Sequence, residues 1–354
     1  MERCVNVLVT GGAGYLGAVL IPKLLVRGHR VRVLDIGYFG VGHLRGMQPA
    51  VELIRDDIRR IRNDRAFLEK LLDGCDCVIH LAAISNDPSA ELQPELTNEV
   101  NYQATEAMAE ACRARGIRLV FSSSCSVYGE ADGELTETGA VAPLTVYAIS
   151  KVKAERLLEV MATPGWRPVI LRNGTLFGYS PRMRFDLVIN IFCLYGALFN
   201  EIKVFGEGVQ WRPFLHVGDC ARAFVHFAEQ PNGEHLVYNI AHENLRVLDL
   251  VTVFRDINPR LKVTFVPTVD PDLRDYRVNT SRMSQAGFRS LVDVRTGAEQ
   301  LTDAIVSGLI PDPESIFYRN AKWLKELQGI GNRDHKDILH LIESFPAMRS
   351  TGRV

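Results

Sequence analysis

Two side chains that can move a proton stand four residues apart, Tyr147 and Lys151, in the stretch YAISK. If this stretch is helical, both side chains lie on one face, because residues four apart are neighbours on a helix. An ammonium group beside a phenol favours the phenolate and lowers its pKa, which suits the phenol to general base work. The pattern is common by chance and also describes a solvated helix face, so its surroundings must support the hypothesis.

A group of hydroxyls lies upstream, in the stretch FSSSCSVYG at 121–129. The apolar run 117–121 predicts a buried strand, and three serines follow at its end. Ligands of open parallel sheets bind outside the carboxyl ends of the strands. The serines either only turn the chain or deliver an oxygen to a reaction, and the rest of the sequence must decide between these two roles.

A glycine-rich loop separates a predicted strand at 5–10 from a predicted helix at 16–26. In this context backbone N–H groups can approach a pyrophosphate, which then lies at the positive end of the helix. Asp35 ends the next predicted strand, where a carboxylate can bind the adenosine ribose hydroxyls and repel the extra phosphate of NADP. We therefore expect NAD rather than NADP. The glycines of the loop are Gly11, Gly12, Gly14 and Gly17.

Strand-like and helix-like segments alternate through the first half of the chain, which predicts a parallel sheet covered on both faces. The fold class is therefore α/β, a Rossmann-type doubly wound sheet with a smaller C-terminal substrate-binding lobe. The predicted strands are 5–10, 31–35, 51–54, 77–83, 117–123 and 168–172, and the predicted helices include 64–72, 99–115 and 146–161.

The alternation of strand-like and helix-like segments becomes irregular after residue 172, and this change sets the expected domain boundaries. We assign 1–172 to a cofactor-binding domain, with a return segment at about 214–240. Residues 173–213 and 241–310 form the substrate-binding lobe. Residues 311–354 are a polar C-terminal tail, with one helix expected at 315–327.

Bulk composition excludes several classes of function. The 354-residue chain is 47% hydrophobic and carries a formal net charge of −1, which gives no electrostatic case for nucleic acid or an anionic membrane surface. Its longest apolar stretch, 187–199, is too short to span a bilayer. Seven cysteines without a CxxC pair, and an N-terminus without a signal-peptide layout, favour reduced thiols in a cytoplasmic protein. We expect no metal site.

These motifs, taken in order, resemble the extended short-chain dehydrogenases/reductases, in the group of NAD-dependent nucleotide-sugar epimerases and dehydratases. The resemblance covers most of residues 4–300 and is far more specific for the family than for the substrate. The matching pieces are GGAGYLG, Asp35, Asp57-Ile58, HLAA at 80–83, Asn101, SSSCSVYG, YAISK and VFGEGVQWRPFLHVGDCARAF.

The resemblance assigns roles to individual residues. It makes Ser124, Tyr147 and Lys151 catalytic, with Ser124 also holding the reacting sugar oxygen. Arg212 would bind the substrate diphosphate, and Arg182 and Arg274 would be further anion contacts, although salt bridges explain those two equally well. The implied cofactor-binding residues are Gly11, Gly14, Tyr15, Leu16, Gly17, Asp35, Asp57, Ile58, Leu81, Ala82, Ala83, Asn101, Ser122, Tyr147 and Lys151.

The resemblance also implies a shared first step, in which NAD+ accepts a hydride from a sugar carbon and a keto-sugar forms. An epimerase is the first expectation. A nucleotide-sugar C4 dehydrogenase or reductase is the alternative, because SPRMRFDLVIN and DPDLRDYRV resemble a branch with such enzymes. A non-catalytic dinucleotide sensor would typically lack the tyrosine and the lysine. Homodimers of the family form through the helices that correspond to 101–115 and 147–161.

One departure from the family bears on the reaction. Dehydratases of the family carry adjacent Asp and Glu residues after the position of Ser124, whereas this chain has Cys125 and Ser126. A serine hydroxyl is a weak acid, and an unperturbed thiol with a pKa of about 8.5 suits the acid role poorly. We therefore expect no 4,6-dehydratase activity. Cys125 is expected to be a packing residue, with an activated thiol base as the alternative.

Overall fold

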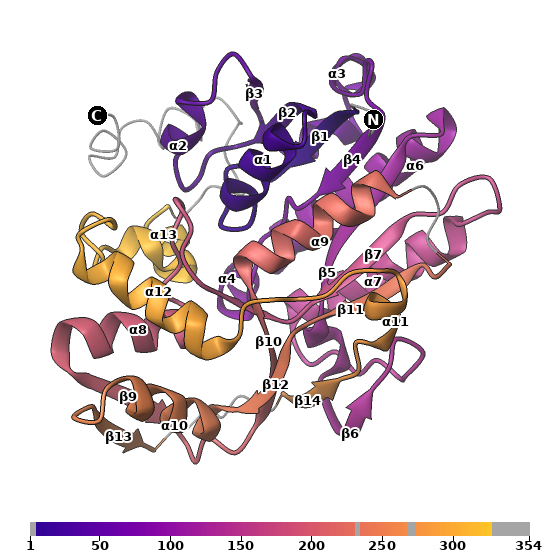
Figure 1. The fold of residues 1–354 in the computed structure, drawn as a ribbon. Coiled ribbons are helices and arrows are strands. Elements are labelled where there is room, and N and C mark those ends of the chain that lie inside the picture. Colours follow the sequence, from indigo (N-terminus) through magenta and orange to yellow (C-terminus); the bar gives the residue numbers. More distant parts are fainter. Residues whose placement is uncertain (1–4, 231–233, 268–273, 328–354) are drawn as a thin grey trace.

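A seven-stranded parallel sheet forms the centre of the computed structural model, which describes residues 5–230, 234–267 and 274–327 (Figure 1). The strand order is β11-β7-β5-β4-β1-β2-β3. This order confirms the predicted doubly wound α/β fold. The strands are β1 (Asn6–Thr10), β2 (Arg30–Asp35), β3 (Val51–Arg55), β4 (Cys77–His80), β5 (Arg118–Ser124), β7 (Val169–Asn173) and β11 (Val237–Ile240).

Helices cover both faces of this sheet, as the nearly continuous apolar strands require. On one face α1 (Gly17–Val26) and α9 (Val217–Glu229) pack together over side chains such as Val9. On the other face α6 (Ala104–Arg115) and α7 (Val146–Met161) bury the neighbouring Leu8. Alternate residues of one strand therefore serve two separate apolar cores.

The strand order reverses between β1 and β4, which lie side by side in the sheet. At such a point the connections leave toward opposite ends of the sheet, and a crevice opens at the carboxyl ends of the strands. The glycine-rich loop follows β1, the HLAA stretch ends β4, and the serines end β5. The topology alone therefore brings three of the sequence motifs to one edge.

The second part of the molecule contains three small sheets and their helices (Figure 1). The chain returns to the first part through α9 and β11, whereas the preceding β10 stays in a three-stranded sheet of the second part. The sheets are β12-β10-β8 (Glu243–Arg246, Trp211–His216, Thr175–Phe177), β13-β9 (Lys262–Val266, Glu201–Phe205) and β14-β6 (Asp275–Val278, Glu130–Leu135). The longer helices are α8 (Val188–Phe199), α10 (Val247–Ile257) and α12 (Val294–Val306).

Short helices connect these elements. The predicted helix at 315–327 is a 3₁₀ turn, η4 (Ile316–Tyr318), followed by α13 (Asn320–Glu326), and residues 328–354 of the expected tail lie outside the described residues. The others are α2 (Gly42–Arg45), η1 (Ile58–Arg62), α3 (Arg65–Leu71), α4 (Asp87–Leu92), α5 (Pro94–Asn98), the π-helix η2 (Glu99–Gln103), η3 (Cys125–Tyr128) and α11 (Ser281–Gln285).

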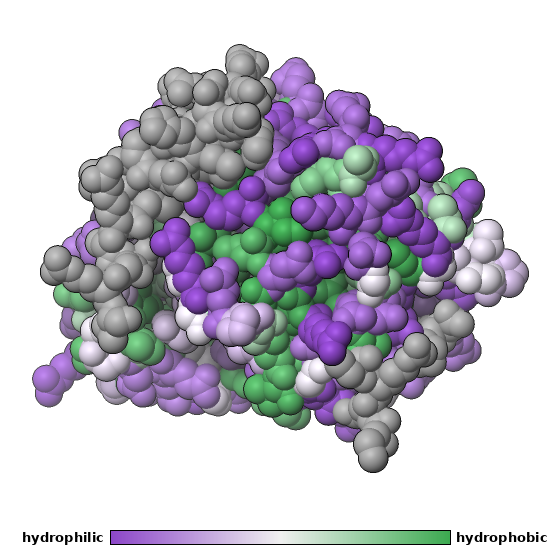
Figure 2. All heavy atoms as spheres, turned by 90° about the horizontal axis from the view of Figure 1, so that it is seen from above, coloured by the Kyte–Doolittle hydropathy of each residue, from purple (hydrophilic) through white to green (hydrophobic). Residues whose placement is uncertain are grey.

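The surface seen from above is mostly hydrophilic, with apolar side chains exposed between polar ones (Figure 2). Among the described residues, no helix combines the length and the apolar composition needed to cross a membrane.

A buried ion pair joins the sheet to α7 directly beneath the crevice. The Arg172 guanidinium on β7 donates to both carboxylate oxygens of Glu155, at 2.7 Å for the shortest contact. The Ser123 hydroxyl donates to the same carboxylate, and Arg172 also donates to the Tyr128 hydroxyl at 2.9 Å. Glu155 and Arg172 are 2% and 4% exposed, so neither charge has water as an alternative partner.

Replacing Glu155 with Ala should therefore leave the Arg172 charge buried without its carboxylate. Removing one partner of a buried pair typically costs about 3–5 kcal/mol, and we expect a loss of this size in the free energy of unfolding by urea. The control is Glu159→Ala, which lies one turn further along α7 at an exposed position. This substitution should change the free energy of unfolding by about 0.5 kcal/mol or less. Equal effects of the two substitutions would contradict this role for Glu155.

Candidate active site

A cavity of about 660 Å³ opens at the carboxyl edge of the central sheet and extends into the second part of the molecule. Its volume lies within the range of small-molecule and cofactor sites, about 300–1,000 Å³. Most of the predicted site residues line it. They are Gly11, Gly14, Tyr15, Leu16, Gly17, Asp35, Asp57, Ile58, Leu81, Ala82, Ala83, Ser122, Ser124, Tyr147, Arg182, Arg212 and Arg274.

The glycines of the glycine-rich loop let the backbone segments at the end of β1 and the start of α1 pack closely. Gly11 has a φ of +71°, and a Cβ there would lie 2.6 Å from the backbone nitrogen of Ala82. A Cβ on Gly17 would lie 2.3 Å from the Gly12 carbonyl oxygen. Helix α1 starts at Gly17 without a side-chain cap, and its positive end can attract a phosphate, although the amides of Ala18 and Val19 already donate to the Gly14 and Leu16 carbonyls.

Asp35 is held at the end of β2 by two backbone donors. Its carboxylate accepts hydrogen bonds from Ala13 N at 2.9 Å and Gly37 N at 2.7 Å. Burial raises the pKa of this carboxyl group, and the two backbone donors oppose that rise. A fixed acceptor beside an uncapped helix N-terminus matches the ribose and the pyrophosphate of a dinucleotide, so the residues present fit NAD.

Two of the expected cofactor residues act on protein groups. Asn101 is fully buried in η2, and its amide donates to the Ile84 carbonyl and Ser150 hydroxyl while accepting from Ile84 N. It therefore positions the loop after β4 rather than forming part of the pocket wall. The Asp57 carboxylate caps η1 and binds the Arg59 guanidinium at 2.7 Å, although Asp57 still lines the pocket.

Ser124 and Tyr147 both line the cavity. Ser124 is the last residue of β5, Tyr147 lies in the first turn of α7, and the Ser124 side chain is close enough to influence the Tyr147 phenol. The pKa of the Tyr147 phenol is raised to about 12, chiefly by burial and also by the nearby Asp87 carboxylate, while Ser124 opposes the rise. The sequence-based expectation of a lowered phenol pKa is therefore wrong for the ligand-free protein.

The Lys151 amine does not offset this rise in the pKa of Tyr147. It donates to the Ser122 carbonyl at 2.7 Å and lies 4.8 Å from the centre of the Phe121 ring, but 5.8 Å from that of Tyr147. Burial lowers the pKa of Lys151 to about 7, while Glu155 raises it. At neutral pH the amine is thus partly uncharged and only weakly favours a phenolate.

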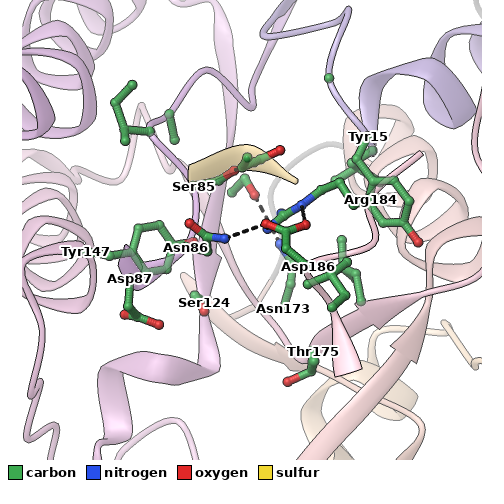
Figure 3. A pocket seen from close by; sticks show the side chains of 18 of the residues that line it. Tyr15, Ser85, Asn86, Asp87, Ser124, Tyr147, Asn173, Thr175, Arg184 and Asp186 are labelled. Carbon is green, nitrogen blue, oxygen red and sulfur yellow. Dashed lines mark hydrogen bonds and ion pairs between the residues drawn. The ribbon is translucent and has the colours of Figure 1, made fainter. Parts of the chain in front are cut away.

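Several residues of the site were not found from the sequence. Arg184 and Asp186 form a bidentate ion pair with both contacts at 2.9 Å, and the Asn86 amide donates to Asp186 at 2.7 Å (Figure 3). Asn86 has a φ of +82° and caps α4, which places Asp87 beside Tyr147. Asn86 and Asp87 follow the end of β4, and their position after a central strand was the available signal.

The three predicted anion-binding arginines occupy different places. Arg212 lines the pocket from β10 and donates to the Trp211 and Arg274 carbonyls. Arg274 donates to Asp87 at 2.6 Å, so its charge is already compensated beside Tyr147. Arg182 lies on the cofactor side, because it interacts electrostatically with Asp35 and lies over the Phe39 ring at 3.8 Å.

The two residues after Ser124 differ in what they can reach. Cys125 is 1% exposed, its thiol donates to the Arg172 carbonyl at 3.2 Å, and burial raises its pKa strongly. These contacts support the packing role and argue against an activated thiol. Ser126 lines the pocket, and its buried hydroxyl has no hydrogen-bond partner among the described residues. It can therefore bond a ligand hydroxyl.

Comparison with known proteins gives a consistent picture. The model of the NAD dependent epimerase/dehydratase family matches residues 7–241. A protein of Bacillus subtilis named as an uncharacterized UDP-glucose epimerase, YtcB, is 30% identical over 273 residues, which are 72% of this chain and 83% of that protein.

Two solved structures share the fold. UDP-glucuronic acid 4-epimerase from Bacillus cereus, in complex with UDP-glucuronic acid and NAD, is 27% identical with a TM-score of 0.73, and the match covers 86% of this chain and 100% of that one. MoeE5, in complex with UDP-glucose and NAD, is 28% identical with a TM-score of 0.71 and the same coverage.

The low pKa of Lys151 predicts a pH-dependent contribution to stability. Between about pH 7 and the ordinary lysine pKa of 10.5, the unfolded chain binds a proton that the native protein lacks, so this contribution rises with pH. Relative to Lys151→Met, the free energy of unfolding of the ligand-free wild type should rise by about 3 kcal/mol from pH 7 to pH 10. Denaturant titrations at several pH values measure it.

The control is Lys153→Met, two residues along α7 at an exposed position. The difference in the free energy of unfolding between Lys153→Met and the wild type should stay constant over the same pH range. A constant difference for Lys151→Met as well would show that the Lys151 amine is solvated.

Proposed function

Because the chain belongs to the NAD-dependent epimerase/dehydratase family, we propose that it is an epimerase that inverts one carbon of a nucleotide-activated sugar. The chain is an NAD-dependent enzyme, as its family is. The names of several relatives and the ligands of two similar structures make a UDP-linked sugar the first substrate to test.

One observation carries the proposal: Ser124 and Tyr147 line the same cavity as the glycine-rich loop and Asp35, and Ser124 is close enough to the Tyr147 phenol to lower its pKa. The chemistry that NAD+ supplies when bound is the acceptance and return of a hydride at a sugar carbon. Oxidation of that carbon also requires a proton to leave its hydroxyl group. Tyr147 and Ser124 form a pair of groups that can hold this oxygen and take the proton.

The residues divide this work by their contacts. Tyr147 accepts the proton, since it is the ionisable member of the pair. Ser124 hydrogen-bonds the same oxygen and keeps its orientation, because β5 fixes the serine backbone. Lys151 stabilises the phenolate when it is charged, and it is held in place by the Ser122 carbonyl. Arg212 and Arg274 are the residues proposed to contact the diphosphate.

Inversion further requires that the oxidised carbon of the sugar can turn either of its two faces toward the bound cofactor. The cavity also carries polar groups that can hydrogen-bond sugar hydroxyls in more than one orientation. They include Asn86 and Asp186, which Figure 3 shows, and the Ser126 hydroxyl. The diphosphate contacts can remain while the sugar turns. These features support a reaction in which the oxidised sugar is reduced again within one site.

The proposal includes a homodimer in the cytoplasm. Helix α7 exposes Ile149 by 42% and Val160 by 84%, which supports the expected pairing through this helix. Among the described residues the cysteines are free thiols, and all of them except Cys75 are buried. A reducing compartment suits this state.

Tyr147→Phe tests the assignment of the base. The variant should lower turnover of the substrate by about 10²–10⁴-fold, because a positioned acid–base group contributes that much, while calorimetry finds NAD affinity nearly unchanged. Lys151→Ala should damage both turnover and NAD binding. Retention of more than a few per cent of the activity by Tyr147→Phe would refute the role.

The nature of the product tests the reaction type. NMR should show an epimer of a nucleotide hexose supplied to the purified enzyme, with no lasting increase in absorbance of reduced nicotinamide. We expect no 4-keto-6-deoxy product by mass spectrometry, because Cys125 and Ser126 supply neither the acid nor the base of that elimination. Loss of one water that depends on Tyr147 would disprove this argument, and steady accumulation of reduced nicotinamide would instead indicate a dehydrogenase.

A further inference from the structure

The C-terminal segment Ser315–Leu327 is docked against the molecule by large buried side chains. Phe317, Tyr318, Trp323 and Leu327 are each at most 9% exposed. Two hydrogen bonds that involve backbone groups join this segment to two distant parts of the chain. Phe185 N donates to the Tyr318 carbonyl at 2.7 Å, and the Trp323 indole donates to the Tyr38 carbonyl at 2.6 Å. We call Ser315–Leu327 the C-terminal strap.

One residue of the strap reaches the cavity with a polar side chain. Asn320 is 3% exposed and lines the pocket together with Ala321. Its amide oxygen accepts from the Arg182 guanidinium, and its amide nitrogen donates to the Ser85 hydroxyl at 3.3 Å. Asn320 therefore links the loop after β8 to the loop after β4 across the cavity.

These anchor points surround the cofactor part of the cavity. Tyr38 and Phe39 follow Asp35 at the end of β2, and Phe39 supports the Arg182 guanidinium at 3.8 Å. Ser85 follows the HLAA stretch at the end of β4. In Figure 1, α13 lies between α2 and α12, at the boundary between the two parts of the molecule.

We propose that the C-terminal strap is part of the NAD-binding site and keeps NAD bound from one turnover to the next, with Asn320 as its contact residue. Release of NAD past this wall would require the strap to leave Tyr38 and Ser85. That movement would break buried hydrogen bonds and expose the aromatic side chains that dock the strap, both of which are costly. Dissociation of NAD is therefore slow.

Retention has a consequence for the reaction, which rests on the proposed function. An epimerase regenerates NAD+ within each turnover and needs no exchange of cofactor. A dehydrogenase must release the reduced cofactor every time. A strap that retains NAD thus favours redox-neutral inversion over net oxidation.

The test measures release of radiolabelled NAD from the loaded full-length protein into excess unlabelled NAD, with no sugar present. Asn320→Ala should release NAD about tenfold faster than the wild type, and calorimetry should show a similar rise in Kd, as expected for lost buried hydrogen bonds. Trp323→Phe keeps most of the ring but loses the bond to Tyr38, and it should accelerate release as well. The exposed Lys322→Ala on the same helix is the control and should release NAD at the wild-type rate.

Thermal unfolding without NAD first establishes that each variant folds. If Asn320→Ala does not fold, the release rate of Trp323→Phe alone tests the role of the strap. Release within twofold of the wild-type rate by the folded variants would overturn the role of the strap. A control that releases NAD as fast as Asn320→Ala would overturn it too. Faster release in a protein that turns over no nucleotide sugar would instead contradict the proposed function and leave the strap supported.

Discussion

The ion pair between Glu155 and Arg172 fixes the relative position of the two elements that carry the groups proposed to react. Glu155 lies on α7, one turn after Lys151 and two turns after Tyr147, and Arg172 lies on β7 beside β5. The same carboxylate binds the hydroxyl of Ser123, the residue before Ser124. A shift of α7 along the sheet would therefore move Tyr147 away from Ser124 and would also leave two buried charges unpaired. The placement of Tyr147 near Ser124, the two residues proposed to be catalytic, thus depends on this buried interaction.

Charge is nearly balanced within the site of the ligand-free protein. Arg184 is paired with Asp186 and Arg274 with Asp87, while the phenol of Tyr147 and the amine of Lys151 both have pKa values moved toward their neutral forms by burial. The site is therefore not poised to remove a proton on its own. A positive charge bound near Tyr147 would favour the phenolate, and a negative diphosphate near Arg274 would compete with Asp87 for this arginine. Such an arrangement couples the proton acceptor to the arrival of its ligands.

Much of the site could be predicted from the sequence because it follows from topology. The glycine-rich loop, Asp35, the serines and the Tyr147–Lys151 pair all stand at strand ends or helix starts, and a parallel sheet brings these to one edge. Asn101 was assigned to the cofactor on the resemblance, whereas its amide is saturated by Ile84 and Ser150, which sequence spacing does not reveal. The pKa of Tyr147 depends on burial and on Asp87, a residue from a distant loop. Asn320 lies 138 residues from Arg182 in the sequence, and only the docked strap brings them together.

The account depends most directly on where a sugar hydroxyl lies relative to Ser124 and Tyr147. A crystal structure of the Tyr147→Phe variant with NAD and a UDP-hexose measures this, since the variant binds its ligands without turning over. We predict that one ring hydroxyl lies about 2.6–3.2 Å from the Ser124 hydroxyl and next to the edge of the aromatic ring that replaces the phenol, as a general base at this position requires. The carbon of that hydroxyl should face the nicotinamide ring. A sugar whose hydroxyls contact neither residue, with its ring bound elsewhere in the cavity, would contradict the assignment of the catalytic site.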